Sequence, residues 1–127
     1  YFTKFGIFWK IIFHIIKIGD TEYKCKINTK GLVSLERRLK SNPINIFMAM
    51  GDENFTLPKI EDLLIIFHES LNTYQHGITM DDVYDIFDKY TEDGKTIVDF
   101  INEIVEIFNV SGLLPKEKKK SKTSAKN

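Results

Sequence analysis

The acid-rich segment 88–99 is the first place in this sequence where residue types and spacing could support chemistry. An EF-hand calcium loop needs oxygen ligands at positions 1, 3 and 5, glycine at position 6 and a bidentate glutamate at position 12. Counted from Asp88, position 3 is Tyr90 and the glycine falls at position 7. Position 12 is Asp99 in place of glutamate. These mismatches argue against calcium, and we interpret the acids as helix caps.

Histidine and cysteine side chains offer no better pattern for catalysis or metal binding. His14, His68 and His76 are far apart and lack the spacing of metal ligands. Cys25 is the single cysteine, so the chain forms no intramolecular disulfide and suits a reducing compartment. The sequence also lacks a phosphate-binding glycine loop and a Gly-x-Ser-x-Gly turn. We therefore predict no catalytic residues, no metal, no cofactor, and a protein that is not an enzyme.

The apolar periodicity predicts an α+β fold, with an N-terminal β-hairpin followed by a bundle of about four helices. The hairpin lies within residues 11–28, where Gly19-Asp20 forms a turn between two β-prone runs. Every second residue from Tyr23 to Ile27 is apolar, which is typical of a half-buried strand and turns Cys25 toward the core. Helices are predicted over residues 29–39, 44–50, 58–76, 79–92 and 96–111, of which the second is short.

Local signals mark where these helices begin. Thr29, Thr79 and Thr96 occupy predicted N-caps, and Pro58 occupies the first position of the longest helix. An aspartate follows each of the last two threonines by three residues, at the position where a capping box has its acid. The side chains expected to face the core are Leu32, Leu35, Leu39, Ile60, Leu63, Leu64, Phe67, Leu71, Tyr74, Val83, Ile86, Phe87, Tyr90, Ile97, Ile101, Ile104, Val105 and Phe108.

The net charge of zero conceals three blocks of unlike charge. Residues 1–50 carry nine Lys or Arg against three Asp or Glu, residues 51–115 carry three against fourteen, and residues 116–127 carry six against one. Such blocks attract one another, either within one chain or between copies. Only two arginines are present and the acidic block repels phosphates, so we predict no nucleic-acid partner.

The two ends of the sequence differ in composition from the body. Residues 1–14 are largely apolar, but charged residues interrupt the run and no cleavage site follows, so we predict neither a transmembrane helix nor a signal peptide. We predict no membrane partner and expect this segment to be an extension outside the domain. A membrane-surface helix is the alternative, and its apolar face would consist of Phe5, Phe8, Trp9, Ile12 and Ile16. Residues 15–115 form the single predicted domain, and residues 116–127 a disordered lysine-rich tail.

Several side chains outside the best core stripes are candidates for contact with a partner protein. The apolar ones would mark a binding patch if they are exposed together. Three aspartates of one helix could meet the basic block of another copy, and such a contact between unlike surfaces builds rings or open helices. The candidates are Phe47, Met50, Phe55, Ile65, Leu113, Leu114, Asp81, Asp82 and Asp85.

Short segments in a fixed order carry a resemblance to a known family. They are residues 18–27 (IGDTEYKCKI), 32–39 (LVSLERRL) with 42–47 (NPINIF), 57–64 (LPKIEDLL) and 110–115 (VSGLLP). Together they resemble the tail assembly chaperones of long-tailed phages and prophages of Gram-positive bacteria. The resemblance covers residues 16–115 and rests on the order of the segments, since the family has no catalytic motif.

This resemblance implies a binding protein that keeps the long tape-measure protein soluble until the tail tube polymerises around it. It implies the host bacterial cytoplasm as the location and the tape-measure protein as the partner. A structural component of the phage tail, such as a tail-tube or completion protein, is the alternative. A small enzyme is a third hypothesis, and it would need a deep polar pocket with converging titratable groups.

Overall fold

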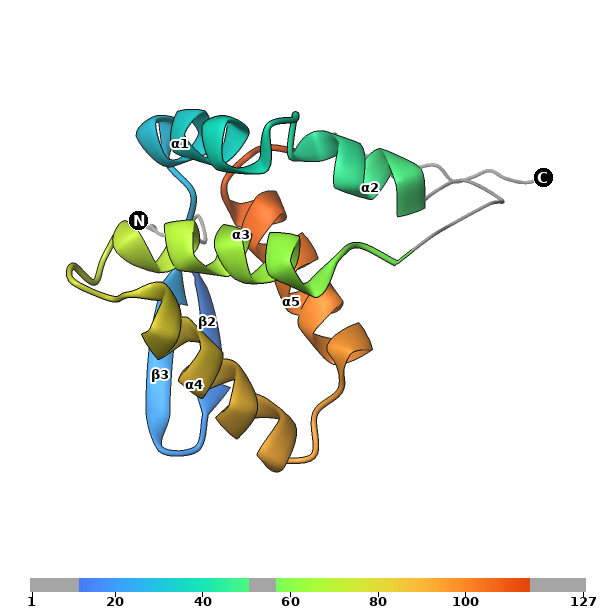
Figure 1. Ribbon diagram of the computed structural model, residues 1–127. Helices are drawn as coiled ribbons and strands as arrows, with labels where there is room; N and C mark the ends of the chain where they lie inside the picture. Colours follow the sequence, from blue (N-terminus) through green and yellow to red (C-terminus); the bar gives the residue numbers. More distant parts are fainter. Residues whose placement is uncertain (1–11, 51–56, 115–127) are drawn as a thin grey trace, which may run out of the picture.

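The computed structural model describes residues 12–50 and 57–114 of the chain. Within these residues a β-hairpin precedes five helices (Figure 1). The predicted α+β fold, a hairpin followed by a helical bundle, is therefore confirmed. The strands are β2 (His14–Ile18) and β3 (Thr21–Cys25), and the helices are α1 (Thr29–Leu39), α2 (Ile44–Met50), α3 (Ile60–Asn72), α4 (Met80–Glu92) and α5 (Ile97–Val110).

The hairpin turns at Gly19 and Asp20, as the sequence predicts. Its antiparallel register pairs His14 with Cys25 at the open end. Gly19 has a φ of 61°, a left-handed conformation that glycine adopts without steric cost. The Gly19 N–H donates to the Asp93 carboxylate at 2.9 Å, so the turn is tied to the end of α4.

The first strand begins inside the segment predicted to be an extension. His14 belongs to β2, and its Nε2 lies 2.6 Å from Oε1 of Glu103 on α5. Ile16 also lies in β2 and is buried, so the alternative of a membrane-surface helix is wrong at that residue. Residues 1–11 lie outside the described part of the chain. Among the described helices, none is long and apolar enough to cross a membrane.

The hairpin is joined to α5 at a second place. The Ile27 N–H, just after β3, donates to Oγ of Ser111 at 2.8 Å, and that hydroxyl donates to the Ile107 carbonyl at 2.7 Å. Ile27 and Ile107 are both buried. Ile107 lies outside the stripe predicted for this helix, so the buried arc of α5 is wider than the prediction.

The central element is α3, which contacts α1, β3, α4 and α5 (Figure 1). Because neighbours surround it, its buried arc is also wider than the predicted stripe and includes Ile66. The two ends of that stripe, Ile60 and Tyr74, are each 38% exposed and lie outside the core. The core residues predicted between them, such as Leu63 and Phe67, are fully buried.

A cluster of aromatic rings joins α3, α4 and α5. Phe100 is 1% exposed, and its ring centroid lies 5.4 Å from that of Phe67, 5.0 Å from that of Phe87 and 5.5 Å from that of Tyr90. The rings meet largely edge to face, the arrangement that aromatic quadrupoles favour. Burial raises the pKa of the Tyr90 hydroxyl well above its ordinary value. Phe100 was absent from the predicted stripe of its helix.

The start of α1 differs from the prediction by one residue. The N-cap is Asn28, whose Oδ1 accepts the Gly31 N–H at 2.8 Å. The prediction of Thr29 as the cap is therefore wrong. Two adjacent polar residues compete for this position, and asparagine is the slightly better N-cap of the two.

α3 is shorter at both ends than predicted. It begins at Ile60, so Pro58 lies before the helix and not at its first position. It ends one turn early, at Asn72. The next residue, Thr73, donates its hydroxyl to the Lys26 carbonyl at 2.6 Å, a contact that fastens the chain to the end of the hairpin.

Two capping boxes confirm the predicted starts of α4 and α5. The Asp82 carboxylate accepts the Thr79 N–H at 2.9 Å, and the Asp99 carboxylate accepts the Thr96 N–H at 2.8 Å. Each threonine hydroxyl in turn accepts the aspartate N–H. The hydrogen bonds from Thr96 hold the pKa of the Asp99 carboxyl below its usual range. Capping thus accounts for Asp99, an acid that the calcium register would have used.

The single cysteine gives the first test of the fold. Cys25 is fully buried, and burial raises the pKa of its thiol from 9.0 to about 12, with the Glu103 charge adding to the rise. We expect iodoacetamide to modify the unfolded chain and spare the native protein, because the thiolate is the reactive form. The free energy of unfolding should also fall as the pH rises from about 9 to about 12, since only the unfolded thiol ionises there. Equal labelling of native and unfolded protein would contradict the buried position.

Candidate functional site

Four of the apolar residues predicted to bind a partner help to cover the core. Phe47, Ile65, Leu113 and Leu114 are half-buried and pack against the buried cluster. The Phe47 ring lies against that of Phe108 on α5, with centroids 4.5 Å apart. These four side chains therefore do not form a freely exposed patch, although each keeps part of its surface open to a partner.

The most exposed large apolar side chain that the structure describes lies on α2. This helix contains no charged residue, and Met48 on it is 69% exposed. Leu57 and Ile60, where the chain enters α3, are 49% and 38% exposed. We call the exposed part of α2 at Met48 the α2 surface. Of the predicted candidates, the Met50 side chain and Phe55 lie outside the described residues.

The three aspartates predicted to bind a partner are exposed in the first half of α4. This helix lies away from α2 (Figure 1). The Asp82 carboxylate serves in the capping box, whereas the carboxylates of Asp81 and Asp85 have no hydrogen bond or ion pair with the described residues. Two contacts, Arg38 with Glu69 and His14 with Glu103, join the basic and acidic blocks within one chain. Association between copies stays a prediction, and it would depend on Asp81 and Asp85.

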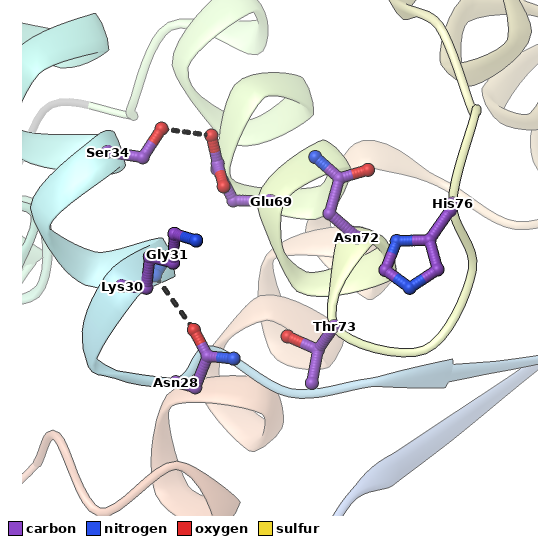
Figure 2. A pocket seen from close by; sticks show the side chains of 8 residues that line it. All are labelled: Asn28, Lys30, Gly31, Ser34, Glu69, Asn72, Thr73 and His76. Carbon is purple, nitrogen blue, oxygen red and sulfur yellow. Dashed lines mark hydrogen bonds between the residues drawn. The ribbon is translucent and has the colours of Figure 1, made fainter.

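The structure also contains a polar hollow that the sequence did not predict (Figure 2). It has a volume of about 390 Å³ and lies between α1 and the second half of α3. The only signal in the sequence is a run of polar residues, from His68 to Ser70, inside an otherwise apolar helix. We call this hollow the Glu69 pocket; its lining residues are Asn28, Lys30, Gly31, Ser34, Glu69, Asn72, Thr73 and His76.

A buried carboxylate forms one wall of the pocket. Glu69 is 8% exposed, and its Oε2 accepts hydrogen bonds from Oγ of Ser34 at 2.5 Å and from Nη1 of Arg38 at 2.8 Å. A buried charge is tolerated when it is paired and hydrogen-bonded in this way. The other oxygen, Oε1, accepts no hydrogen bond from the described residues and faces the pocket (Figure 2).

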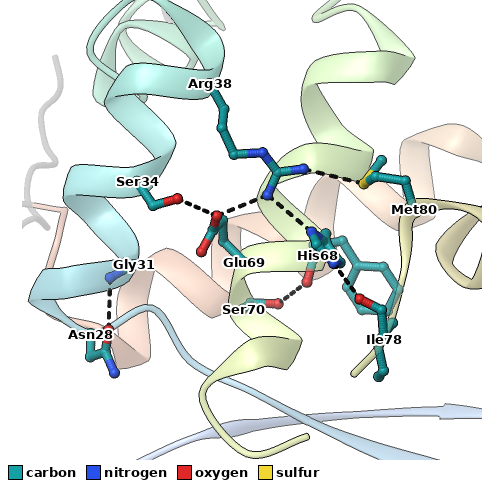
Figure 3. Close-up of polar contacts among 10 residues, drawn as sticks. Asn28, Gly31, Ser34, Arg38, His68, Glu69, Ser70, Ile78 and Met80 are labelled. Atoms are coloured by element: carbon teal, nitrogen blue, oxygen red, sulfur yellow. Dashed lines mark hydrogen bonds and ion pairs between the residues drawn. The ribbon is translucent and has the colours of Figure 1, made fainter. Parts of the chain in front are cut away.

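Arg38, the ion-pair partner of Glu69, also determines the tautomer of His68 (Figure 3). Arg38 Nη1 lies 2.9 Å from Nδ1 of His68, and His68 Nε2 lies 2.6 Å from the Ile78 carbonyl oxygen. A guanidinium only donates and a carbonyl only accepts, so Nδ1 accepts and Nε2 carries the hydrogen. His68 is therefore the neutral Nε2–H tautomer, and it links α1 to the loop before α4.

Ser34, His68 and Glu69 are residue types that form catalytic triads, but they do not have the geometry of a triad here. Nucleophilic catalysis by Ser34 would require a base that contacts its hydroxyl and is itself oriented by a third group. Both ring nitrogens of His68 are occupied elsewhere, and Ser34 donates directly to Glu69. In the described part of the chain, no three His, Cys, Asp or Glu side chains gather to hold a metal ion. The arrangement suits binding of a polar group better than covalent chemistry.

Comparison with known proteins places the chain in a family. A family model described as "Family of unknown function (DUF6096)" matches residues 10–127. The match spans nearly the whole chain, so the chain belongs to this family. No curated protein and no solved structure matches it.

Proposed function

We propose that this member of the family is a tail assembly chaperone that binds the tape-measure protein of a long-tailed phage in the host bacterial cytoplasm. The four-part resemblance over residues 16–115 supplies the identity of the partner. The observation that supports a binding role is the α2 surface. Met48 there is the most exposed large apolar side chain among the described residues.

The construction of α2 suits a docking element. Phe47 anchors the helix on Phe108 of the core, and Pro43 just before it is buried. Met48 is left pointing to solvent on a helix with no charged side chain. Methionine is flexible and polarizable, so it packs against partners of differing shape. An amphipathic helix of a long partner would bury its apolar face against such a surface.

The proposal is tested by co-expression with segments of the tape-measure protein. The wild-type chain should keep a segment soluble and co-purify with it. Met48→Asp should lose both effects while the variant itself stays folded, because the side chain is 69% exposed. Val98→Asp is the matched control: this residue is 55% exposed in the first turn of α5, where an added carboxylate is favourable.

Three outcomes separate the hypotheses. Loss of solubilisation in Met48→Asp alone supports the α2 surface as the binding site. Failure of the wild-type chain to bind any tape-measure segment would overturn the proposal. Recovery of the chain from purified virions in stoichiometric amounts would favour the alternative, a structural component of the tail.

A further inference from the structure

Two exposed helix faces carry charges of opposite sign. One lies on α1, where three cations surround an apolar side chain and Glu36 lies at the edge. The other lies on α4, where four acids surround an aromatic side chain and Lys89 lies at the edge. Residues three or four positions apart share one side of a helix. We define the basic face of α1 as Lys30, Val33, Arg37 and Lys40, and the acidic face of α4 as Asp81, Tyr84, Asp85, Asp88 and Glu92.

The charges on both faces have no ion-pair partner among the described residues. The two ion pairs in this part of the chain are Arg38 with Glu69 and His14 with Glu103, and neither includes a member of the two faces. All members of both faces are exposed. These charges can therefore meet a second molecule without any change in the described fold.

Two other cations of the basic block are less available than those of α1. Lys24 lies over two aromatic rings, with its Nζ 5.1 Å from the centroid of Phe13 and 6.0 Å from that of Tyr74. Lys17 is paired in register with Glu22 on the neighbouring strand, a position where opposite charges attract. The basic face of α1 is thus the part of the described block in which unpaired cations gather.

The two faces lie on different sides of the molecule. α1 and α4 both pack against α3, and Figure 1 shows α1 above α3 and α4 below it. The buried residues of each helix, such as Leu35 on α1 and Val83 on α4, lie opposite its charged face. One chain therefore cannot cover its own basic face with its own acidic face. A contact between unlike faces of two copies leaves one of each unoccupied, so further copies can add.

The two faces also match in length and in content. α1 has 11 residues and α4 has 13, which gives lengths of about 16 and 20 Å. Val33 is 41% exposed and Tyr84 is 45% exposed, so each face offers apolar surface beside its charges. Burial of that surface contributes affinity, and the charges orient the two copies. Every copy carries both faces, so a second copy supplies the acidic helix that fits the basic face.

We propose that the basic face of α1 docks on the acidic face of α4 in a second copy, and that copies associate head to tail through this contact. The cations of α1 pair with the acids of α4, and Val33 and Tyr84 lose their exposure to solvent between them. This proposal goes beyond the chaperone role, and it rests on no residue of the α2 surface.

Sedimentation velocity of the full chain at increasing protein concentration tests the proposal. At about 0.01 M salt the Debye length is about 30 Å, and at about 1 M it is about 3 Å. We expect species larger than a dimer at the lower salt concentration, and association weaker by roughly ten-fold or more at the higher one. Circular dichroism at both salt concentrations checks that the fold is unchanged.

Charge-reversal variants locate the contact. Arg37→Glu with Lys40→Glu, and separately Asp85→Lys with Asp88→Lys, should each weaken association roughly ten-fold or more. All four substitutions in one chain restore the net charge and exchange the signs of the two faces, so association should return. An equimolar mixture of the two reversed chains also brings opposite charges together, and it should associate as well.

Lys59→Glu with Lys95→Glu is the matched control. Both lysines are exposed outside the two faces, so this variant should associate as the wild type does. It changes the net charge by the same amount as the α1 reversal, which separates the local contact from the overall charge. If the α1 reversal lowers the melting temperature, Arg37→Gln with Lys40→Gln repeats the test with a smaller change in charge.

Four results would each overturn the proposal. One is a monomer at the lower salt concentration at every protein concentration, and another is association that stops at the dimer. The third is equal weakening by the control and by the α1 reversal, which would assign association to net charge. The fourth is an absence of recovery in both the combined variant and the mixture. None of these results changes the outcome of the Met48→Asp assay, so the two proposals can fail separately.

Discussion

Phe100→Ala should lower the free energy of unfolding by about 3–5 kcal/mol, enough to unfold much of the protein if its stability is ordinary. The ring is 1% exposed and contacts three rings from two other helices, α3 and α4. Removing it deletes a large apolar side chain and its edge-to-face contacts, and it leaves a cavity that α3, α4 and α5 cannot all close.

Chemical denaturation followed by circular dichroism measures this effect. Val98→Ala is the control on the same helix, because Val98 is 55% exposed and its loss should change stability by less than about 0.5 kcal/mol. A cost below about 1 kcal/mol for Phe100→Ala would show that this cluster is not the centre of the core.

Arg38→Ala should cost about 2–3 kcal/mol of stability, through a different mechanism. It leaves the buried Glu69 carboxylate with the Ser34 hydroxyl as its remaining described partner, and it removes the donor to Nδ1 of His68. Breaking a buried ion pair from one side typically costs about 3–5 kcal/mol. The Arg38 side chain is partly exposed, so solvent screening reduces that figure.

Arg37→Ala provides the matched control, because Arg37 is the exposed neighbour on the same helix and carries the same charge. It should change stability by less than about 0.5 kcal/mol. In a double-mutant cycle, Arg38→Ala should cost less stability in the Glu69→Gln background than in the wild type. The reason is that the glutamine leaves no uncompensated buried charge when Arg38 is removed. Equal effects of the two arginine substitutions would mean that the Arg38 contact adds nothing to stability.

Local features were predictable from the sequence because their causes are local. The Gly19-Asp20 turn and the two Thr–Asp capping boxes each depend on residues within four positions of one another. The width of the buried arc on α3 could not be predicted in the same way. A one-sided stripe describes a helix at the surface, whereas α3 is covered by α1 on one side and by the hairpin, α4 and α5 on others.

The Glu69 pocket was not predictable because its parts are distant in the sequence. Arg38 and Ser34 lie on α1, and they reach Glu69 across 31 and 35 residues. The role of His68 was not predictable either, because its tautomer depends on its contacts with Arg38 and with the Ile78 carbonyl. The apolar candidates for partner binding depend on distant contacts in the same way. Phe47 was predicted to bind a partner, but in the structure its ring packs against that of Phe108 and attaches α2 to the core.

The attachment of the hairpin to α5 has a consequence for the order in which the protein can fold during its synthesis. Ile27 is separated from Ser111 by 84 residues and His14 from Glu103 by 89. A ribosome adding about 5–20 residues per second needs roughly 4–17 s to make the chain between Ile27 and Ser111. Throughout that time the inward face of the hairpin, with Ile16 and Ile18, lacks its α5 partner. The contacts of the hairpin with α5 therefore form only after the last helix has been made, whereas its contacts with α3 and α4 can form earlier.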